Sequence, residues 1–154
     1  MEASVEYLGH KVDADGLHPT KEKVASILES NKPNNVEKLC IFLGLVNYYG
    51  KFMPNLSNKL APVYFLLGNN VQWKWTSEYE KAFQDCKKCL TSDSLLVHYD
   101  VKKPLHLACD ASPYGVGCVI SHTMPNGDER PIAFASRTLT PAEKNYAQIE
   151  REVT

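Results

Sequence analysis

The sequence predicts an α+β protein in which a helical half precedes a three-stranded antiparallel meander that leads into the start of a helix. Up to about residue 90, apolar residues recur at helical spacing, most clearly in the segment 39–46. From residue 94 onward, β-rich runs alternate with turn signals, and Asn126-Gly127 is the strongest of these. With 154 residues, the chain is long enough for one ordinary domain or two small pieces.

The first elements are a strand and a helix. A short strand is expected over residues 6–12, and the turn 13–16 ends it. A helix then starts near Pro19, because the fixed φ of proline suits a first helical turn. Val24 and Ile27 begin its apolar stripe.

Three more helices follow in this half. Asn34 or Asn35 caps the first of them, and Pro54 ends it. Another begins near Ser57. After an extended segment at 71–75, Thr76 caps a last helix that reaches about residue 90.

The second half is predicted to be a meander followed by a helix start. The three strands are expected at 105–110, 116–122 and 131–136. Thr140, Pro141 and Glu143 then form a capping box, which is typical of the first turn of a helix.

Composition excludes several classes of protein. No apolar run approaches the length of a membrane span, and the N-terminus has no signal-peptide core, so we expect an intracellular protein with no membrane partner. The 17 basic and 18 acidic residues are spread along the chain, which gives no support for a strong autonomous nucleic-acid binder. The five cysteines and five histidines show neither disulfide nor metalloprotease spacing, and the lone Cys86-x-x-Cys89 motif lacks the other ligands of a zinc site.

Asp110 is the most informative residue for function. It closes the apolar run 105–109, which predicts a carboxylate at the solvent-facing end of a buried strand. A metal-dependent nuclease needs an acid in such a position. The alternative is that Asp110 caps the following turn, for which Ser112, Pro113 and Gly115 supply ordinary turn chemistry. The glycines of Gly115-Val116-Gly117 precede a strand rather than a helix, so we interpret them as letting the strand bend and not as a phosphate loop.

The order of motifs resembles the polymerase polyprotein of gypsy-type long-terminal-repeat retrotransposons over nearly the whole chain. The similarity begins with a passage that leaves the reverse-transcriptase palm, continues through a thumb signature and a connecting segment, and ends at the start of a ribonuclease H domain. The motifs that carry it are Tyr7-Leu8-Gly9-His10, Phe42-Leu43-Gly44-Leu45-Val46-Asn47-Tyr48-Tyr49, Trp75-Thr76, Asp110-Ala111-Ser112, Gly115-Val116-Gly117 and Pro131-Ile132-Ala133-Phe134-Ala135-Ser136-Arg137.

The resemblance implies a division of the chain into three parts. Residues 1–68 are expected to hold the end of the palm and a thumb-like helical region, and residues 69–93 a connecting segment with one helix. Residues 94–154 would be the N-terminal part of a ribonuclease H-like domain. Because the strands that complete such a sheet are not among these residues, we expect an exposed sheet edge through which the protein associates.

The resemblance also implies a chemistry. Ribonuclease H of this type hydrolyses the RNA strand of an RNA–DNA hybrid with two Mg²⁺ (or Mn²⁺) ions held by acids. Asp110 matches the first acid, which is both a catalytic residue and a metal ligand. The second comes from the helix after the third strand, where Glu150 and Glu152 are both candidates; periodicity does not choose between them, and the family pattern favours Glu152.

The polymerase part implies contacts with a template–primer duplex or an RNA–DNA hybrid. By resemblance, the residues expected to contact nucleic acid are Asn47, Tyr48, Lys51, Ser112 and Arg137. The family commonly has basic residues before Phe52, whereas Gly50 and Lys51 stand here, which weakens the expected phosphate contacts.

Two classes of function stay open. The parent activity would be RNA-directed DNA synthesis with hydrolysis of the RNA strand. The polymerase acids and the later ribonuclease H acids are not among these 154 residues. The alternative is therefore an inactive element remnant, or a domesticated module that binds nucleic acid or protein without catalysis.

Overall fold

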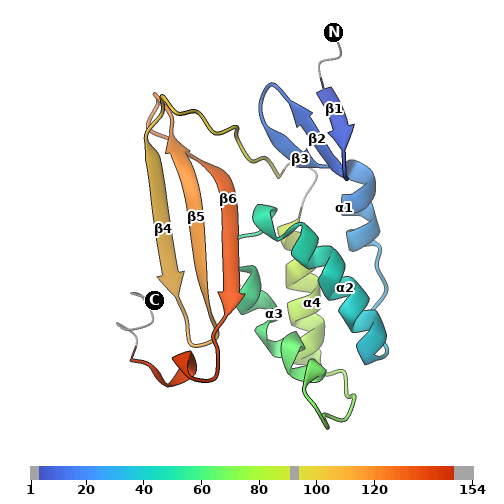
Figure 1. Cartoon of the computed structure of the whole chain (residues 1–154). Coiled ribbons are helices and arrows are strands. Elements are labelled where there is room, and N and C mark those ends of the chain that lie inside the picture. The colour runs from blue at the N-terminus through green and yellow to red at the C-terminus, as the bar shows by residue number, and fades with distance from the viewer. Residues whose placement is uncertain (1–3, 91–93, 148–154) are drawn as a thin grey trace.

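The computed structural model describes residues 4–90 and 94–147. Two antiparallel three-stranded sheets and four α-helices make up this part of the chain, which confirms the predicted α+β class (Figure 1). In Figure 1, all four helices lie on one side of the second sheet, whose last strand is the nearest to them. None of the described helices has the length and apolarity needed to span a membrane.

The first sheet consists of β1 (Ser4–Tyr7), β2 (His10–Asp13) and β3 (Leu17–Pro19) in that order. The prediction of one strand over 6–12 is wrong, because the chain reverses at Leu8-Gly9, where φ is +47° and +73°. Positive φ at both central residues is the geometry of a tight hairpin turn. Leucine rarely adopts this conformation. The Tyr48 hydroxyl donates a 2.5 Å hydrogen bond to the Leu8 carbonyl and helps to hold it there.

The first two helices are α1 (Lys21–Leu28) and α2 (Val36–Tyr48). α1 begins two residues after Pro19, because Pro19 pairs with His10 as part of β3. Of the two predicted caps of α2, Asn34 and Asn35, the structure selects Asn35, whose side chain accepts a 2.8 Å hydrogen bond from the backbone N–H of Lys38.

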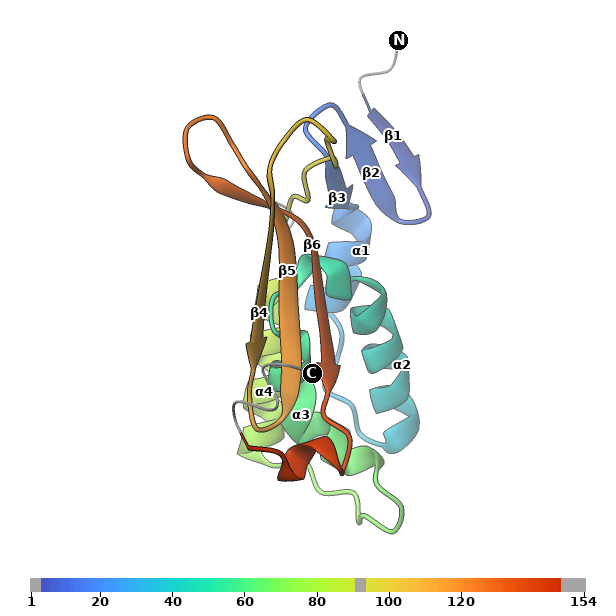
Figure 2. The same ribbon diagram turned by 60° about the vertical axis from the view of Figure 1, so that its left-hand side comes forward.

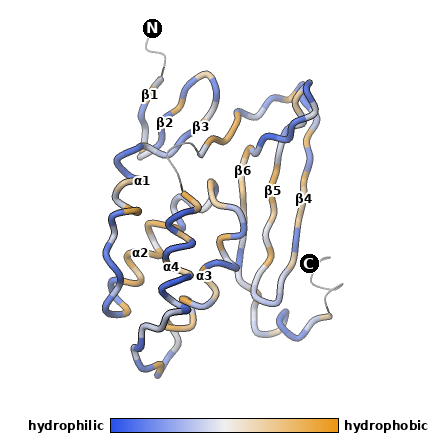
Figure 3. Tube along the Cα trace, turned by 180° about the vertical axis from the view of Figure 1, so that it is seen from behind, coloured by the Kyte–Doolittle hydropathy of each residue, from blue (hydrophilic) through white to orange (hydrophobic). Residues whose placement is uncertain are grey.

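The remaining helical elements are η1 (Gly50–Phe52), α3 (Leu56–Tyr64), η2 (Phe65–Leu67) and α4 (Ser77–Cys89), where η marks a 3₁₀ turn. The predicted cap Thr76 accepts from the backbone N–H of Tyr79 at the start of α4. Hydrophobic residues alternate with hydrophilic ones along the helices (Figure 3). Their apolar faces meet in one core, whose fully buried members include Ile27, Leu39, Val46, Tyr49, Leu60, Val63, Phe83 and Cys86.

The second sheet is the predicted meander of β4 (Leu105–Ala111), β5 (Gly115–Thr123) and β6 (Glu129–Thr138). β5 and β6 are joined by a turn in which Gly127 takes φ +86° and donates its N–H to the Met124 carbonyl. The register between β5 and β6 shifts near Ser121, which lies opposite Pro131. Proline has no backbone N–H to donate, and such an irregularity in the pairing tolerates it.

β4 is an exposed edge strand, so the prediction of a buried strand before Asp110 is wrong. The Leu107 side chain is 71% exposed, and the outer edge of β4 pairs with no other described strand. The cause is tertiary: α3 packs against β5 and β6, and Figure 2 shows the sheet from the side with β4 in front of the helices. Association through this edge stays a prediction.

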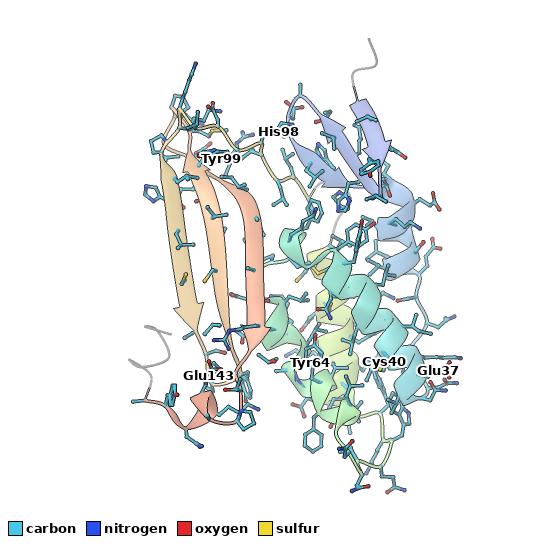
Figure 4. All side chains as sticks on the ribbon, viewed as in Figure 1. Glu37, Cys40, Tyr64, His98, Tyr99 and Glu143 are labelled. Carbon is cyan, nitrogen blue, oxygen red and sulfur yellow. The ribbon has the colours of Figure 1, made fainter. Side chains whose placement is uncertain are left out.

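The two sheets are connected by the segment that precedes β4. Leu96 exchanges two backbone hydrogen bonds with Leu17 of β3, and the N–H of Val97 donates to the Pro131 carbonyl of β6. His98 and Tyr99 continue this segment between the sheets (Figure 4). The side chain of His98 also contacts the backbone carbonyl of Asp13 at 2.7 Å. These bonds fix the start of the meander relative to the helical half.

The capping box at Thr140 is confirmed, whereas the helix after it is only a 3₁₀ turn, η3 (Glu143–Asn145), within the described residues. Thr140 Oγ1 accepts from the N–H of Glu143, and the Glu143 carboxylate accepts from the N–H of Thr140 at 2.8 Å. The turn ends at Tyr146, whose φ and ψ of −73° and 149° are extended. The expected α-helix therefore does not continue through Tyr146.

Candidate functional site

Asp110 stands near the end of β4, beside a hollow of about 170 Å³. The hollow lies between β4, β5, Phe134 of β6 and the residues Pro54 and Asn55 that precede α3. The side chain of Asp110 is exposed and makes no hydrogen bond or ion pair with any residue in 4–90 or 94–147. A solvated carboxylate without a protein partner keeps its lone pairs available for a cation.

The alternative role for Asp110, capping the next turn, is contradicted. The turn amides of Tyr114 and Gly115 both donate to Ser112 Oγ, at 3.1 and 3.0 Å. Ser112 therefore satisfies the backbone of the turn. The Asp110 carboxylate is left out of it.

The glycines of β5 have a packing role that differs from the predicted bend. The side-chain oxygen of Asn55 lies where a β-carbon on Gly117 would collide with it. A β-carbon on Gly115 would stand 2.6 Å from Ser57 Oγ and 2.6 Å from the Arg137 carbonyl. Both glycines thus allow the start of α3 to approach the sheet directly beside Asp110.

Hydrogen bonds reinforce this contact between helix and sheet. Ser112 Oγ donates to Asn58 Oδ1 at 2.6 Å, and the backbone N–H of Ser57 donates to Ser136 Oγ at 3.1 Å. α3 and the sheet are therefore joined by small polar groups. A role of Ser112 in contacting nucleic acid stays a prediction, and its hydroxyl already serves the fold.

Among the described residues, no other acid lines the hollow beside Asp110. Across residues 4–90 and 94–147, no three His, Cys, Asp or Glu side chains gather as they would around a metal ion. Glu150 and Glu152, the predicted second ligands, lie outside the described residues. Asp110 fits a hard cation as one ligand, and the described part of the site supplies that ligand alone.

Glu143 is engaged elsewhere. Its carboxylate accepts two 2.8 Å hydrogen bonds from the Arg137 guanidinium, and this pairing together with the bonds from Thr140 lowers the Glu143 pKa to about 2. Figure 4 shows Glu143 at the end of the sheet where β6 leads into η3. The Arg137 guanidinium is therefore ion-paired with Glu143. To contact nucleic acid, Arg137 would have to break this ion pair or bind a phosphate in addition to Glu143.

A second hollow, of about 430 Å³, gathers three of the predicted nucleic-acid contacts. Asn47, Tyr48 and Lys51 line it together with the β1–β2 turn and His10. Tyr48 is half-exposed, and Lys51 Nζ lies 5.6 Å from the centre of the Phe52 ring. Partial burial lowers the Lys51 pKa from its ordinary value. The surface thus offers an aromatic ring and a cation, beside an Asn47 amide that already pairs with the Tyr64 hydroxyl.

His10 belongs to this surface and was not predicted. It is buried, and its ring contacts those of Tyr48, Tyr49 and Phe52 at centroid separations of 5.3–5.7 Å. Desolvation, and then the charge of Lys51, lower its pKa, and Nε2 has no hydrogen-bond partner among the described residues. The spacing of His10 and Val12, two residues apart on β2, could have indicated that both side chains lie on one face of the sheet. A single histidine at such a position is too common to indicate a binding surface.

Comparison with known proteins decides the family. The family described as "RNase H-like domain found in reverse transcriptase" matches residues 75–154, which include α4, the whole second sheet and Asp110. The chain belongs to this family. The match covers about half of the chain, and the first sheet and α1–α3 precede it.

Relatives extend the similarity of this RNase H-like domain to the rest of the chain. The transposon Tf2-3 and Tf2-4 polyproteins of Schizosaccharomyces pombe (strain 972 / ATCC 24843) are each 33% identical over 152 residues, or 99% of the chain. The chain spans 11% of the length of each polyprotein. It thus corresponds to the reverse transcriptase/RNase H-like region of retrotransposon polyproteins, which confirms the resemblance found in the sequence.

Solved structures support the same assignment. The foamy viral protease-reverse transcriptase in complex with dsDNA has a TM-score of 0.79 and 28% identity, and covers 97% of this chain and 31% of that one. The same enzyme in complex with an RNA/DNA hybrid has a TM-score of 0.78 and 28% identity, over 98% of this chain and 20% of that one. The RNase H-like sheet and the helical half are therefore arranged in this chain much as they are in a reverse transcriptase.

Proposed function

We propose that the chain contributes Asp110 as a metal ligand to the ribonuclease H site of a retrotransposon reverse transcriptase. In this proposal residues 1–68 are the end of the palm and the thumb-like region, residues 69–93 are a connecting segment, and residues 94–154 begin the ribonuclease H-like domain. The family match itself starts earlier, at residue 75, and includes α4 of the connecting segment. The parent activity is RNA-directed DNA synthesis with hydrolysis of the RNA strand of an RNA–DNA hybrid.

The observation that carries the proposal is the free carboxylate of Asp110. Asp110 lies on the first strand of the sheet that the family match covers, and it is exposed beside a hollow with no described partner. An aspartate that served the fold would accept hydrogen bonds from nearby amides, as Ser112 does here.

Asp110 suits Mg²⁺ or Mn²⁺, because carboxylate oxygens are the ligands that hard divalent cations prefer. When bound, two such ions would stabilise the charge that develops on a phosphate during hydrolysis. Glu152 is the proposed second ligand, with Glu150 as the runner-up.

The proposed nucleic-acid surface is the hollow that holds Asn47, Tyr48 and Lys51. Its partly buried cation can pair with a backbone phosphate, and the half-exposed tyrosine can stack on a sugar or base. The comparison proteins bound to dsDNA and to an RNA/DNA hybrid support a duplex as the partner. Ser112 and Arg137 are weaker members of the set because both side chains are engaged in the fold.

Paramagnetic Mn²⁺ tests the metal ligand. Titration into the ¹⁵N-labelled chain should broaden the amide signals of Ala111 and Gly117 before others, and Asp110→Asn should remove that effect. Asp128→Asn is the matched control, since Asp128 is an exposed aspartate in the β5–β6 turn, and it should leave the broadening near Ala111 unchanged. Equal broadening in Asp110→Asn and the unaltered chain would contradict the assignment.

Cleavage of an RNA–DNA hybrid distinguishes an enzyme from a non-catalytic module. Mg²⁺-dependent cleavage of the RNA strand that disappears in Asp110→Asn would establish activity in this chain. A folded chain that shows Mn²⁺ broadening at Ala111 but no cleavage would indicate a ligand whose partners are supplied elsewhere. A folded chain with neither property would favour the remnant.

Fluorescence anisotropy with a labelled RNA–DNA hybrid tests the binding surface. Lys51→Ala should weaken binding and reduce its salt dependence by about one phosphate contact. Lys74→Ala is the control, because Lys74 does not line the hollow. Equal affinities for both variants would rule out the proposed surface.

A further inference from the structure

Two cysteines face each other across the meander, and the proposed function does not use them. The antiparallel register places Cys109 of β4 directly opposite Cys118 of β5. Both are free thiols; Cys109 is exposed and Cys118 is partly exposed. They lie one residue from Asp110 and Gly117, which form the next pair of the same register.

The register sets the separation of the two thiols. Residues directly opposite in an antiparallel pair have α-carbons about 4.5–5.5 Å apart, whichever hydrogen-bonding position they occupy. A disulfide requires α-carbons about 4.4–6.8 Å apart. The backbone therefore needs no large movement to form a bridge.

The other thiols are placed less favourably. Cys86 is fully buried in the helical core, and burial raises its pKa to about 12, which suppresses the reactive thiolate. Cys89, three residues further along the chain, therefore has an unreactive thiol as its closest possible disulfide partner in the sequence. Cys40 is exposed on α2, on the side of the molecule away from β4 (Figure 4).

We propose that Cys109 and Cys118 are a redox-active dithiol that closes to a cross-strand disulfide. The co-reactant is a small-molecule disulfide such as oxidised glutathione. The thiolate of exposed Cys109 attacks one sulfur of this disulfide, forms a mixed disulfide and releases one glutathione thiolate. The thiolate of Cys118 then attacks the Cys109 sulfur of the mixed disulfide and releases the second glutathione thiolate. The protein loses two electrons and two protons, and the oxidised glutathione becomes two thiols.

The bridge would act on the strand that carries the candidate ligand. β4 is the exposed edge of the sheet, and its backbone hydrogen bonds to β5 hold Asp110 in register, together with the Ser112–Asn58 bond at the following turn. A covalent link one residue away ties that edge to the central strand. The inference rests on the register and exposure of the thiols and does not require Asp110 to bind metal.

Oxidation of the reduced, folded chain with oxidised glutathione tests the proposal. Remaining thiols are alkylated, and chymotrypsin then cuts after the exposed Tyr114, which lies between the two cysteines. The peptides that contain Cys109 and Cys118 should stay joined until a reductant is added. Cys118→Ser should instead hold glutathione on Cys109 as a mixed disulfide, and Cys40→Ser should bridge as the unaltered chain does.

A denatured control shows whether the fold directs the pairing. In concentrated urea the short Cys86–Cys89 loop should compete, and the share of the Cys109–Cys118 bridge should fall. Stable mixed disulfides on Cys109 in the folded chain, without an intramolecular bridge, would overturn the proposal. So would an equal yield of the bridge in the folded and the denatured chain. Circular dichroism of each variant confirms that folded protein is being compared.

Discussion

The hydroxyl of Ser112 donates a 2.6 Å hydrogen bond to the side-chain oxygen of Asn58, and so joins the β4–β5 turn to helix α3. The same oxygen of Ser112 accepts from the N–H groups of Tyr114 and Gly115. One serine thus organises the turn after Asp110 and also fixes it to the helical half.

Removal of this link should destabilise the whole chain. Ser112→Ala leaves two turn amides and Asn58 without their partner, so we expect a loss of about 1–3 kcal/mol in the free energy of unfolding. A double-mutant cycle with Asn58→Ala should give a coupling energy of about 0.5–1.5 kcal/mol. Urea denaturation measures both. Ser26→Ala, on the exposed face of α1, should change the stability by less than about 0.5 kcal/mol.

Gly117 should tolerate no side chain. In Gly117→Ala the new methyl group collides with the Asn55 side chain, so we expect a loss of about 1–3 kcal/mol. Adding Asn55→Gly should recover part of it, because Asn55 has φ +52°, which glycine adopts readily. Gly44→Ala is the control: Gly44 lies inside α2, and apart from its chain neighbours and the backbone of its own helix no atom lies within 4 Å of its β-carbon position, so alanine should stabilise by up to about 1 kcal/mol. Equal effects at both glycines would refute the packing argument.

Acid should release the Arg137–Glu143 pair. The ordinary pKa of glutamate is 4.5, and the Glu143 pKa in the folded chain is lowered to about 2. Because the pKa is lower in the folded chain, the ionised Glu143 stabilises the fold, and this contribution is complete at pH values above the pKa of the unfolded chain. It is lost as the pH falls from about 4.5 to about 2. The side-chain carboxyl ¹³C shift of Glu143 should therefore titrate near pH 2. A midpoint near 4.5 would show that the pair does not form in solution.

His122 should be needed for the connection that leads into β4. It is fully buried; its Nε2 accepts from the N–H of Asp100, and its Nδ1 lies 3.0 Å from the Pro104 carbonyl. The first bond requires an acceptor at Nε2, so the ring is neutral with its proton on Nδ1. His122→Leu should cost about 1–3 kcal/mol in thermal or urea unfolding. His106→Leu, at an exposed position of β4, should cost less than about 0.5 kcal/mol.

Local sequence was sufficient to predict the backbone where a single side chain determines the local structure, as at a helix cap. Thr76 caps the helix that it was predicted to cap, and Asn35 is one of the two residues predicted to cap α2. A side-chain oxygen and an amide three residues later are enough for such a bond. The hairpin at Leu8-Gly9 was missed for the opposite reason. A leucine at positive φ is unfavourable locally and is stabilised by the hydroxyl of Tyr48, forty positions away in the chain.

Features of the candidate site can likewise be separated into those that local sequence predicts and those that depend on distant contacts. Motif order and hydrophobic periodicity were enough to predict the family, the α+β order of elements and the place of Asp110 near the end of a strand. The folded structure was needed to show that this strand is an exposed edge, that Ser112 and not Asp110 satisfies the turn, and that Arg137 pairs with Glu143. Burial and pairing depend on which distant elements meet, and here the start of α3 meets the sheet at Gly115 and Gly117.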